Sequence, residues 1–178
     1  MEGLGWRNIP ITLTMMRRFE YKLFADYFQF YLQDESFKGD LSESWTPEAV
    51  DRLLAVAPGT FGVGTVRNMN VPVVVEVTDT EPDANLDAWD HVNECSLEVS
   101  SGRVVIAGCT DYFPDAARIE VLPGSYRARV YYGNLSSLSD DGLDGDDRYK
   151  VILWRAAPAP EQVLKQRSPQ TGRPSSTD

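Results

Sequence analysis

The only histidine of the chain, His91, lies among carboxylates that could bind a metal ion with it. Asp87 and Asp90 precede it, and Glu94 follows three residues later. On a helix, Asp87, His91 and Glu94 would share one face, and imidazole with carboxylates is a ligand set for divalent metals. A turn-like Pro-Asp-Ala-Asn segment precedes them and a strand pattern follows, which would separate these side chains. We therefore expect a surface imidazole at the start of a strand, with a metal-dependent enzyme centred on His91 as the alternative.

A second cluster of carboxylates, interleaved with glycine, lies between two predicted strands. Its members are Asp140, Asp141, Asp144, Asp146 and Asp147. Several oxygen ligands on a sharply turning backbone suit calcium, but Gly142 falls where the calcium-loop pattern needs a ligand. We expect instead an acidic loop that contacts a basic protein surface and steers association with it. A calcium-stabilised structural β-sandwich module is the alternative.

Other catalytic patterns are weak. A Ser-His-Asp or Cys-His arrangement would have to use His91. Residues 59–64 contain spaced glycines, but neither a helix nor a Lys-Ser/Thr pair follows, as a phosphate-binding loop requires. A strand that bulges or packs closely against a neighbour explains these glycines better. The sequence therefore predicts no catalytic residues, no cofactor and a non-enzymatic protein.

The composition favours a protein partner over a nucleic acid or a membrane. The 178 residues include 27 acidic and 17 basic ones, which gives a formal net charge of −10. A field of that sign repels nucleic acid and anionic lipid and attracts basic proteins, although acidity for solubility alone is the simpler explanation. No stretch reaches the roughly 20 apolar residues of a membrane span, and the first residues do not resemble a secretory signal. We expect a cytoplasmic protein.

The clearest predicted helix covers residues 46–57. Thr46 is a typical N-cap, Pro47 suits the first helical position, and Pro58-Gly59 would end the helix. Its apolar stripe would be buried and consists of Val50, Leu53, Leu54 and Ala57. The aromatic segment 19–32 favours a strand, although it also fits one face of a helix.

Short strands are predicted over most of the remaining chain, separated by turn signals. They cover residues 60–66, 71–78, 91–100, 103–109, 118–122, 125–132 and 148–154. Their spacing predicts a mostly β protein, an antiparallel β-sandwich of about seven to eight strands with one short helix. Residues 17–155 would form this domain, residues 1–16 an N-terminal extension and residues 156–178 a flexible C-terminal tail.

The two cysteines bear on the pairing of two of these strands. A three-residue loop at Ser101-Gly102 would place Cys95 opposite Cys109 on one apolar face of a hairpin. Glu94, Ser96 and Glu98 would then point to solvent. In a reducing compartment, we expect two buried thiols rather than a disulfide.

Several short motifs resemble the competence protein J family of nuclease inhibitors. They are Trp45–Val50 at the start of the predicted helix, Ala57–Thr60, Arg67-Asn68, Leu122–Tyr126 and Asp147–Tyr149. The resemblance spans residues 19 to 154, and none of its motifs is catalytic. The chain departs from the family in its longer acidic loop, its terminal segments and its cysteine pair.

The resemblance implies a non-enzymatic protein that binds a partner, with inhibition of a DNA-entry nuclease as the family's best-known use. It also implies structural roles: Trp45 in the core, Gly124 in a turn, and Tyr126 and Tyr149 at the start of strands. Together with the charge, it predicts an inhibitor of a basic nuclease or toxin.

Overall fold

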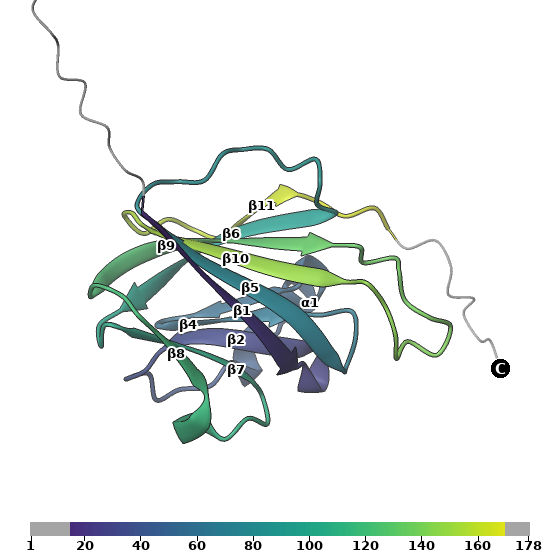
Figure 1. The fold of residues 1–178 in the computed structure, drawn as a ribbon, viewed down its shortest axis with the longest axis horizontal. Helices are drawn as coiled ribbons and strands as arrows, with labels where there is room; N and C mark the ends of the chain where they lie inside the picture. The colour runs from purple at the N-terminus through teal and green to yellow at the C-terminus, as the bar shows by residue number, and fades with distance from the viewer. Residues whose placement is uncertain (1–14, 170–178) are drawn as a thin grey trace, which may run out of the picture.

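The computed structural model describes residues 15–169, and its larger sheet has six strands (Figure 1). Their spatial order is β1 (Met16–Phe24), β5 (Asn70–Thr78), β10 (Arg148–Arg155), β9 (Gly124–Gly133), β6 (His91–Val99) and β11 (Gln162–Lys165). All neighbours are antiparallel except β5 and β10, which run parallel. This parallel pair is the one departure from the predicted antiparallel order in the described sheets.

The second sheet has five antiparallel strands. Their order is β3 (Leu54–Ala57), β4 (Thr60–Gly64), β2 (Gln29–Asp34), β7 (Arg103–Gly108) and β8 (Ala117–Glu120). One α-helix in the described residues, α1 (Pro47–Arg52), and three 3-10 turns, η1 (Asp26–Phe28), η2 (Ser42–Ser44) and η3 (Phe113–Asp115), connect the strands. The predicted mostly β fold with one short helix is confirmed, with eleven strands in residues 15–169 rather than seven or eight.

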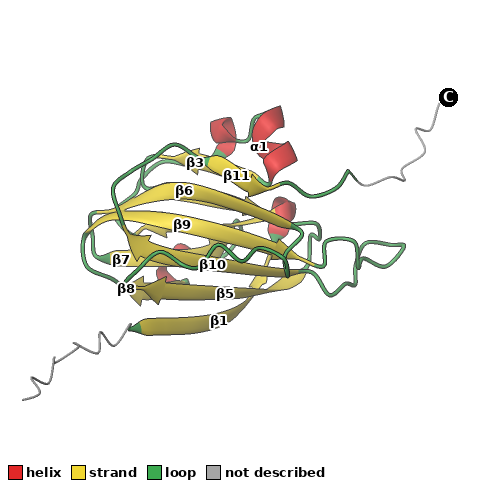
Figure 2. Ribbon diagram, turned by 90° about the horizontal axis from the view of Figure 1, so that it is seen from above, coloured by secondary structure: helices red, strands yellow, loops and turns green. Residues whose placement is uncertain are grey.

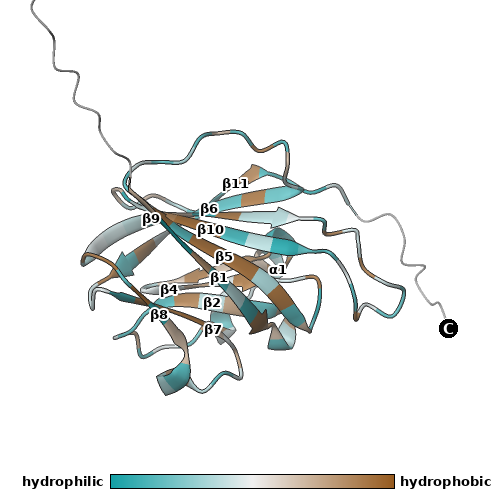
Figure 3. Ribbon diagram, in the orientation of Figure 1, coloured by the Kyte–Doolittle hydropathy of each residue, from teal (hydrophilic) through white to brown (hydrophobic). Residues whose placement is uncertain are grey.

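The core fills the space between the two sheets. On β2, Phe30 and Leu32 point inward and are fully buried, while the residues between them face outward. Val73 and Val75 on β5 and Val151 on β10 contribute from the other sheet. Figure 3 shows the apolar character of these strands as brown segments.

The outer face of the six-stranded sheet is also partly covered. Ile152 and Trp154 of β10 pack there with Tyr131, under Leu86 and Trp89 of the loop between β5 and β6. That loop crosses over the sheet (Figures 1 and 2). Burial on both faces explains why residues 151–154 are continuously apolar instead of alternating.

The predicted helix 46–57 is too long. Thr46 caps it as predicted, because its Oγ1 accepts a hydrogen bond from the Ala49 amide, but the helix ends at Arg52. Leu53 adopts a left-handed conformation (φ 59°), and the chain continues as β3, paired with β4. Val50 is therefore exposed rather than part of a buried stripe.

The predicted hairpin between residues 91–100 and 103–109 is wrong. β6 belongs to the six-stranded sheet and β7 to the other, so the Ser101-Gly102 turn carries the chain across the core. Cys95 is buried, whereas Cys109 is exposed. The aromatic segment 19–32 likewise divides between the sheets, with β1 in one, β2 in the other and η1 between them.

The ends of the chain differ in part from the prediction. Within the segment predicted to be a tail, Gln162–Lys165 form β11 and pair with β6. β1 begins at Met16, and the rest of the expected extension, residues 1–14, lies outside the described residues, as do residues 170–178. No helix within residues 15–169 has the length and apolar character to cross a membrane.

Candidate partner-binding surface

The acidic loop, residues 138–146, lies in the connection between β9 and β10 and extends beyond the sandwich at the right of Figure 1. Hydrogen bonds within the loop give it a defined shape. Ser139 N donates to Asp144 O at 2.8 Å, and Asp141 Oδ1 accepts from Ser139 Oγ at 2.6 Å and from Leu143 N at 3.0 Å. These bonds hold the pKa of Asp141 below its usual value, so it stays ionised. Exposed carboxylates in the loop belong to Asp140, Asp141, Asp144 and Asp146.

Asp147, predicted as a fifth contact residue, faces inward and is fully buried. Its Oδ1 accepts a hydrogen bond from Arg67 Nε at 2.6 Å, and its Oδ2 accepts one from the Tyr149 hydroxyl at 2.7 Å. A buried carboxylate needs such partners to remain charged. Asp147 therefore supports the loop from below and does not present its charge to a partner.

Arg67 joins the acidic loop to the body of the protein. Besides its ion pair with Asp147, its Nη1 donates to the Leu143 carbonyl at 3.2 Å. Tyr149 completes the support, because its hydroxyl accepts from the Val66 amide at 3.0 Å while donating to Asp147. Two segments distant in the sequence, Val66-Arg67 and Asp147–Tyr149, thus meet beneath the loop.

Next to Arg67, Asn68 contacts Phe28, which forms with Tyr27 a pair of exposed aromatic residues that we call the aromatic tip. The Phe28 amide donates to Asn68 Oδ1 at 3.4 Å, and the Phe28 carbonyl accepts from Thr65 N at 2.8 Å. Both aromatic residues have positive φ (56° and 58°), a conformation that is unfavourable for bulky side chains. The fold thus holds two aromatic rings in solvent on a strained turn.

The acidic loop and the aromatic tip border one groove of about 940 Å³. Phe28 lines it from one side, and Leu138, Asp140 and Asp141 line it from the other. Leu143 at the loop apex is half exposed. Aromatic and acidic side chains therefore form one continuous surface.

The predicted cluster of metal-binding side chains around His91 does not assemble. His91 is buried, not on the surface as predicted: its Nε2 lies 2.8 Å from the Arg52 carbonyl, and its Nδ1 accepts from the Arg167 amide at 3.2 Å. A carbonyl only accepts, so Nε2 carries the hydrogen. Burial lowers the pKa of His91, which keeps the ring neutral. His91 thus caps the C-terminal end of α1 by donating to the Arg52 carbonyl.

The carboxylates around His91 point to different partners. Asp87 is exposed, and Asp90 Oδ2 accepts from Leu135 N at 2.8 Å. Glu94, predicted to face solvent, is buried between Arg127 and Arg129 at 2.8 and 2.9 Å. Within residues 15–169, no group of three or more His, Cys, Asp or Glu side chains is placed to hold a metal ion, in this cluster or in the acidic loop.

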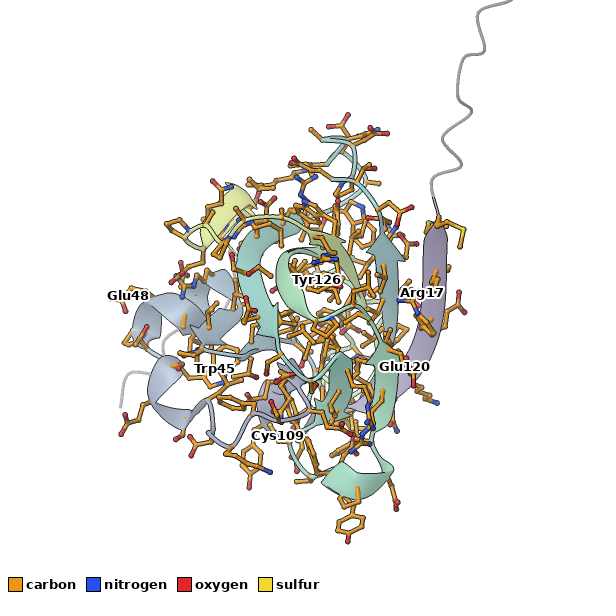
Figure 4. All side chains as sticks on the ribbon, turned by 90° about the vertical axis from the view of Figure 1, so that its left-hand side faces the viewer. Arg17, Trp45, Glu48, Cys109, Glu120 and Tyr126 are labelled. Carbon is orange, nitrogen blue, oxygen red and sulfur yellow. The ribbon has the colours of Figure 1, made fainter. Side chains whose placement is uncertain are left out.

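Trp45 lies on the outer face of the five-stranded sheet, not in the core as the resemblance implied. It lies close to the short helix that carries Glu48 (Figure 4), and its Nε1 donates to Gln29 Oε1 at 2.7 Å. A Cβ at Gly62 would lie 2.8 Å from the Trp45 ring, so glycine makes room for the indole. This agrees with the close packing predicted for residues 59–64.

Sequence reasoning missed the aromatic tip. The only signal is the density of aromatic residues in segment 19–32, a pattern that favours a strand and also fits one face of a helix, but does not indicate a turn. Nothing in the sequence marks Tyr27 and Phe28 for left-handed conformations, because aromatic residues disfavour them.

Comparison with known proteins identifies the fold. No family model matches the chain, and no curated protein matches it in sequence. Among solved structures, ComJ from Bacillus subtilis, an inhibitor of the DNA degrading activity of NucA, matches with a TM-score of 0.63 and 16% identity. The match covers 80% of this chain and 99% of that one. This chain has the ComJ fold.

A second solved structure, described as crocagin biosynthetic gene J, matches with a TM-score of 0.51 and 17% identity over 79% of this chain and 97% of that one. The resemblance to the ComJ family drawn from short motifs is thus supported at the level of structure. Two of those motifs, Arg67-Asn68 and Asp147–Tyr149, meet beneath the candidate surface in this chain.

Proposed function

We propose that this chain is a non-enzymatic binding protein that inhibits a basic enzyme, in the first place a nuclease, by placing its acidic loop against the enzyme's cationic cleft. The observation that carries the proposal is the set of exposed carboxylates on one internally hydrogen-bonded loop: Asp140, Asp141, Asp144 and Asp146.

The charge of the loop suits a nuclease that grips DNA. Such an enzyme must neutralise phosphates, so its cleft is lined by Lys and Arg. A loop with several carboxylates offers the same charge on a fixed frame and avoids part of the ordering cost of binding. The net charge of −10 adds long-range attraction, which speeds encounter at low salt.

The ComJ fold supports the same direction, since ComJ inhibits the DNA degrading activity of NucA. At 16% identity, the likeness extends to the fold alone, so the partner of this chain is inferred from its own surface. A basic toxin with a similar cationic cleft would satisfy the same chemistry.

The test uses the basic protein fraction of the organism that encodes this chain, retained on a cation exchanger at pH 7. Degradation of linear DNA by this fraction is measured with increasing amounts of the purified chain. We expect inhibition by the wild-type chain. A variant with Asp140, Asp141, Asp144 and Asp146 changed to Asn should associate at least about tenfold more slowly at low salt and show a flatter salt dependence.

The matched control removes the same charge elsewhere, with Glu20, Asp83, Asp115 and Glu120 changed to Gln or Asn. All four are exposed, and β8, which carries Glu120, lies at the other end of the sandwich from the acidic loop (Figures 1 and 4). Equal inhibition by the loop variant and the wild type would refute the role of the loop. Absence of inhibition by the wild type would refute the proposed function.

A further inference from the structure

An apolar cleft of about 490 Å³ adjoins the acidic groove that the loop and the aromatic tip border, because Phe28 lines both. Tyr27, Phe28, Trp45, Val50 and Leu53 line it. These residues come from η1, from α1 and from the residues that flank α1, so the cleft exists only because the helix stops at Arg52 and the chain turns back toward β4.

The cleft gathers several exposed apolar side chains. Tyr27, Phe28 and Val50 are 72%, 54% and 55% exposed, and all three border it. Contiguous exposed apolar groups of this kind mark interaction sites more often than scattered ones. Elsewhere the fold buries rings such as Phe30 and Tyr132 completely.

Two polar side chains of the cleft are already hydrogen-bonded to the protein itself. Trp45 Nε1 donates to Gln29 Oε1 at 2.7 Å, and Thr65 Oγ1 donates to the Arg67 carbonyl at 2.7 Å. An occupant thus meets mainly carbon surface, and a hydrocarbon or aromatic side chain is the group that gains most from entering.

The acidic loop indicates what carries that side chain. Phe28 lines both the cleft and the acidic groove, so a partner bound to one contacts the other. A cationic protein can pair its basic side chains with the acidic loop and place an apolar side chain in the cleft. A second copy of this chain would bring two acidic loops to one interface, and their repulsion would oppose association.

We propose that the cleft receives an exposed apolar side chain of the same basic partner and anchors it. This inference rests on the proposed function and assigns a separate task to each half of the surface. The carboxylates accelerate encounter, whereas the cleft, shielded from water once filled, slows dissociation.

The test replaces the exposed apolar groups without disturbing the fold. The tip variant carries Tyr27→Asn and Val50→Ser, since Asn tolerates a left-handed backbone and Ser is no worse than Val in a helix. The matched control carries Tyr112→Asn and Leu122→Ser, at positions that are 71% and 66% exposed. Melting temperatures of both should stay near that of the wild type.

Each chain is first mixed with the basic fraction until DNA degradation is inhibited. The mixture is then diluted into buffer that contains no added inhibitor, and the recovery of DNA degradation is followed over time. We expect the tip variant to release the activity at least about tenfold faster than wild type and control, with an unchanged salt dependence of association.

The outcomes separate the two proposals. If the wild type inhibits and the tip variant releases the activity at the wild-type rate, the cleft inference is overturned while the proposed function stands. If the wild type does not inhibit, both fall. If sedimentation shows a wild-type dimer that the tip substitutions dissociate, the cleft belongs to a second copy, and the inference is overturned.

Discussion

Arg67 and Asp147, 80 positions apart in the sequence, form a buried ion pair with 2.6 Å between Nε and Oδ1. Asp147 is fully enclosed, and Arg67 has little contact with solvent. The pair lies at the base of the acidic loop, and Asn68 holds the aromatic tip beside it. The adjacent residues Arg67 and Asn68 thus position the two halves of the candidate surface, the acidic loop and the aromatic tip.

Breaking this pair should destabilise the whole fold. Asp147→Asn leaves the Arg67 guanidinium buried without its counter-charge, which costs about 3–5 kcal/mol in comparable buried pairs. We expect a loss of that order in the free energy of unfolding, measured by urea denaturation at pH 7. Asp144→Asn, in the exposed part of the same loop, should change it by less than about 0.5 kcal/mol.

A second comparison tests the coupling between the two side chains. The double variant Arg67→Met and Asp147→Leu removes both charges, so it should be more stable than either single variant carrying one unpaired charge. If the double variant lost as much stability as the two single variants together, the pair would not act as a unit.

The neutral state of His91 predicts a pH dependence of stability. The unfolded chain takes up a proton near the ordinary pKa of 6.5, whereas burial lowers the pKa of His91 in the folded chain. Below 6.5 the unfolded state therefore binds more protons, and acidification favours unfolding. The contribution of the neutral His91 ring to the free energy of unfolding is complete above pH 6.5. As the pH falls below this value, it declines by up to about 1.4 kcal/mol per pH unit until the folded ring also protonates.

The measurement compares the free energy of unfolding of the wild type and His91→Gln between pH 7.5 and pH 5. The wild type should lose more stability over this range than the variant, because glutamine does not titrate. Carboxylates contribute equally to both curves, so the difference isolates the imidazole. Parallel curves would mean that His91 takes up protons equally in the folded and unfolded chains.

Much of the fold could be predicted from local sequence patterns, because strand position depends on residues two apart. The assignment of strands to sheets could not. The Ser101 turn looks like a hairpin, but Asp34 at the end of β2 accepts hydrogen bonds from Ser101 N and Ser100 Oγ, both at 2.9 Å. These bonds hold the turn against the other sheet. A contact across 66 positions leaves no trace in a local pattern.

The candidate site divides in the same way. The acidic loop follows from composition alone, since a run of Asp and Gly between strands is exposed in nearly any β fold. Asp147 belongs to that run by sequence but to the interior by structure, because its partner Arg67 lies on a distant segment. The tip was not predictable, because its exposure depends on left-handed backbone angles at Tyr27 and Phe28.

The two cysteines should differ in reactivity. Cys95 is buried in the core, where desolvation raises its pKa to about 12, while Cys109 is exposed. Only the thiolate reacts, so a thiol reagent at pH 8 should modify one cysteine of the native chain and two of the denatured chain. Cys109→Ser should abolish the native reaction. Two native equivalents would indicate that the core around Cys95 opens.

The strained backbone of the aromatic tip makes a final prediction that separates folding from function. A left-handed conformation costs a non-glycine residue about 1–2 kcal/mol, and a glycine at position 27 would avoid this cost. Glycine also has more conformational freedom in the unfolded chain, which offsets part of the stabilisation. Tyr27→Gly should therefore leave the free energy of unfolding unchanged or raise it by about 1 kcal/mol. Phe30→Ala, which removes a fully buried ring on β2, should lower it by about 3–5 kcal/mol. If Tyr27→Gly costs as much as a core substitution, the ring supports the fold. If it costs nothing and release of the nuclease accelerates, Tyr27 is retained for contact with a partner at the expense of stability.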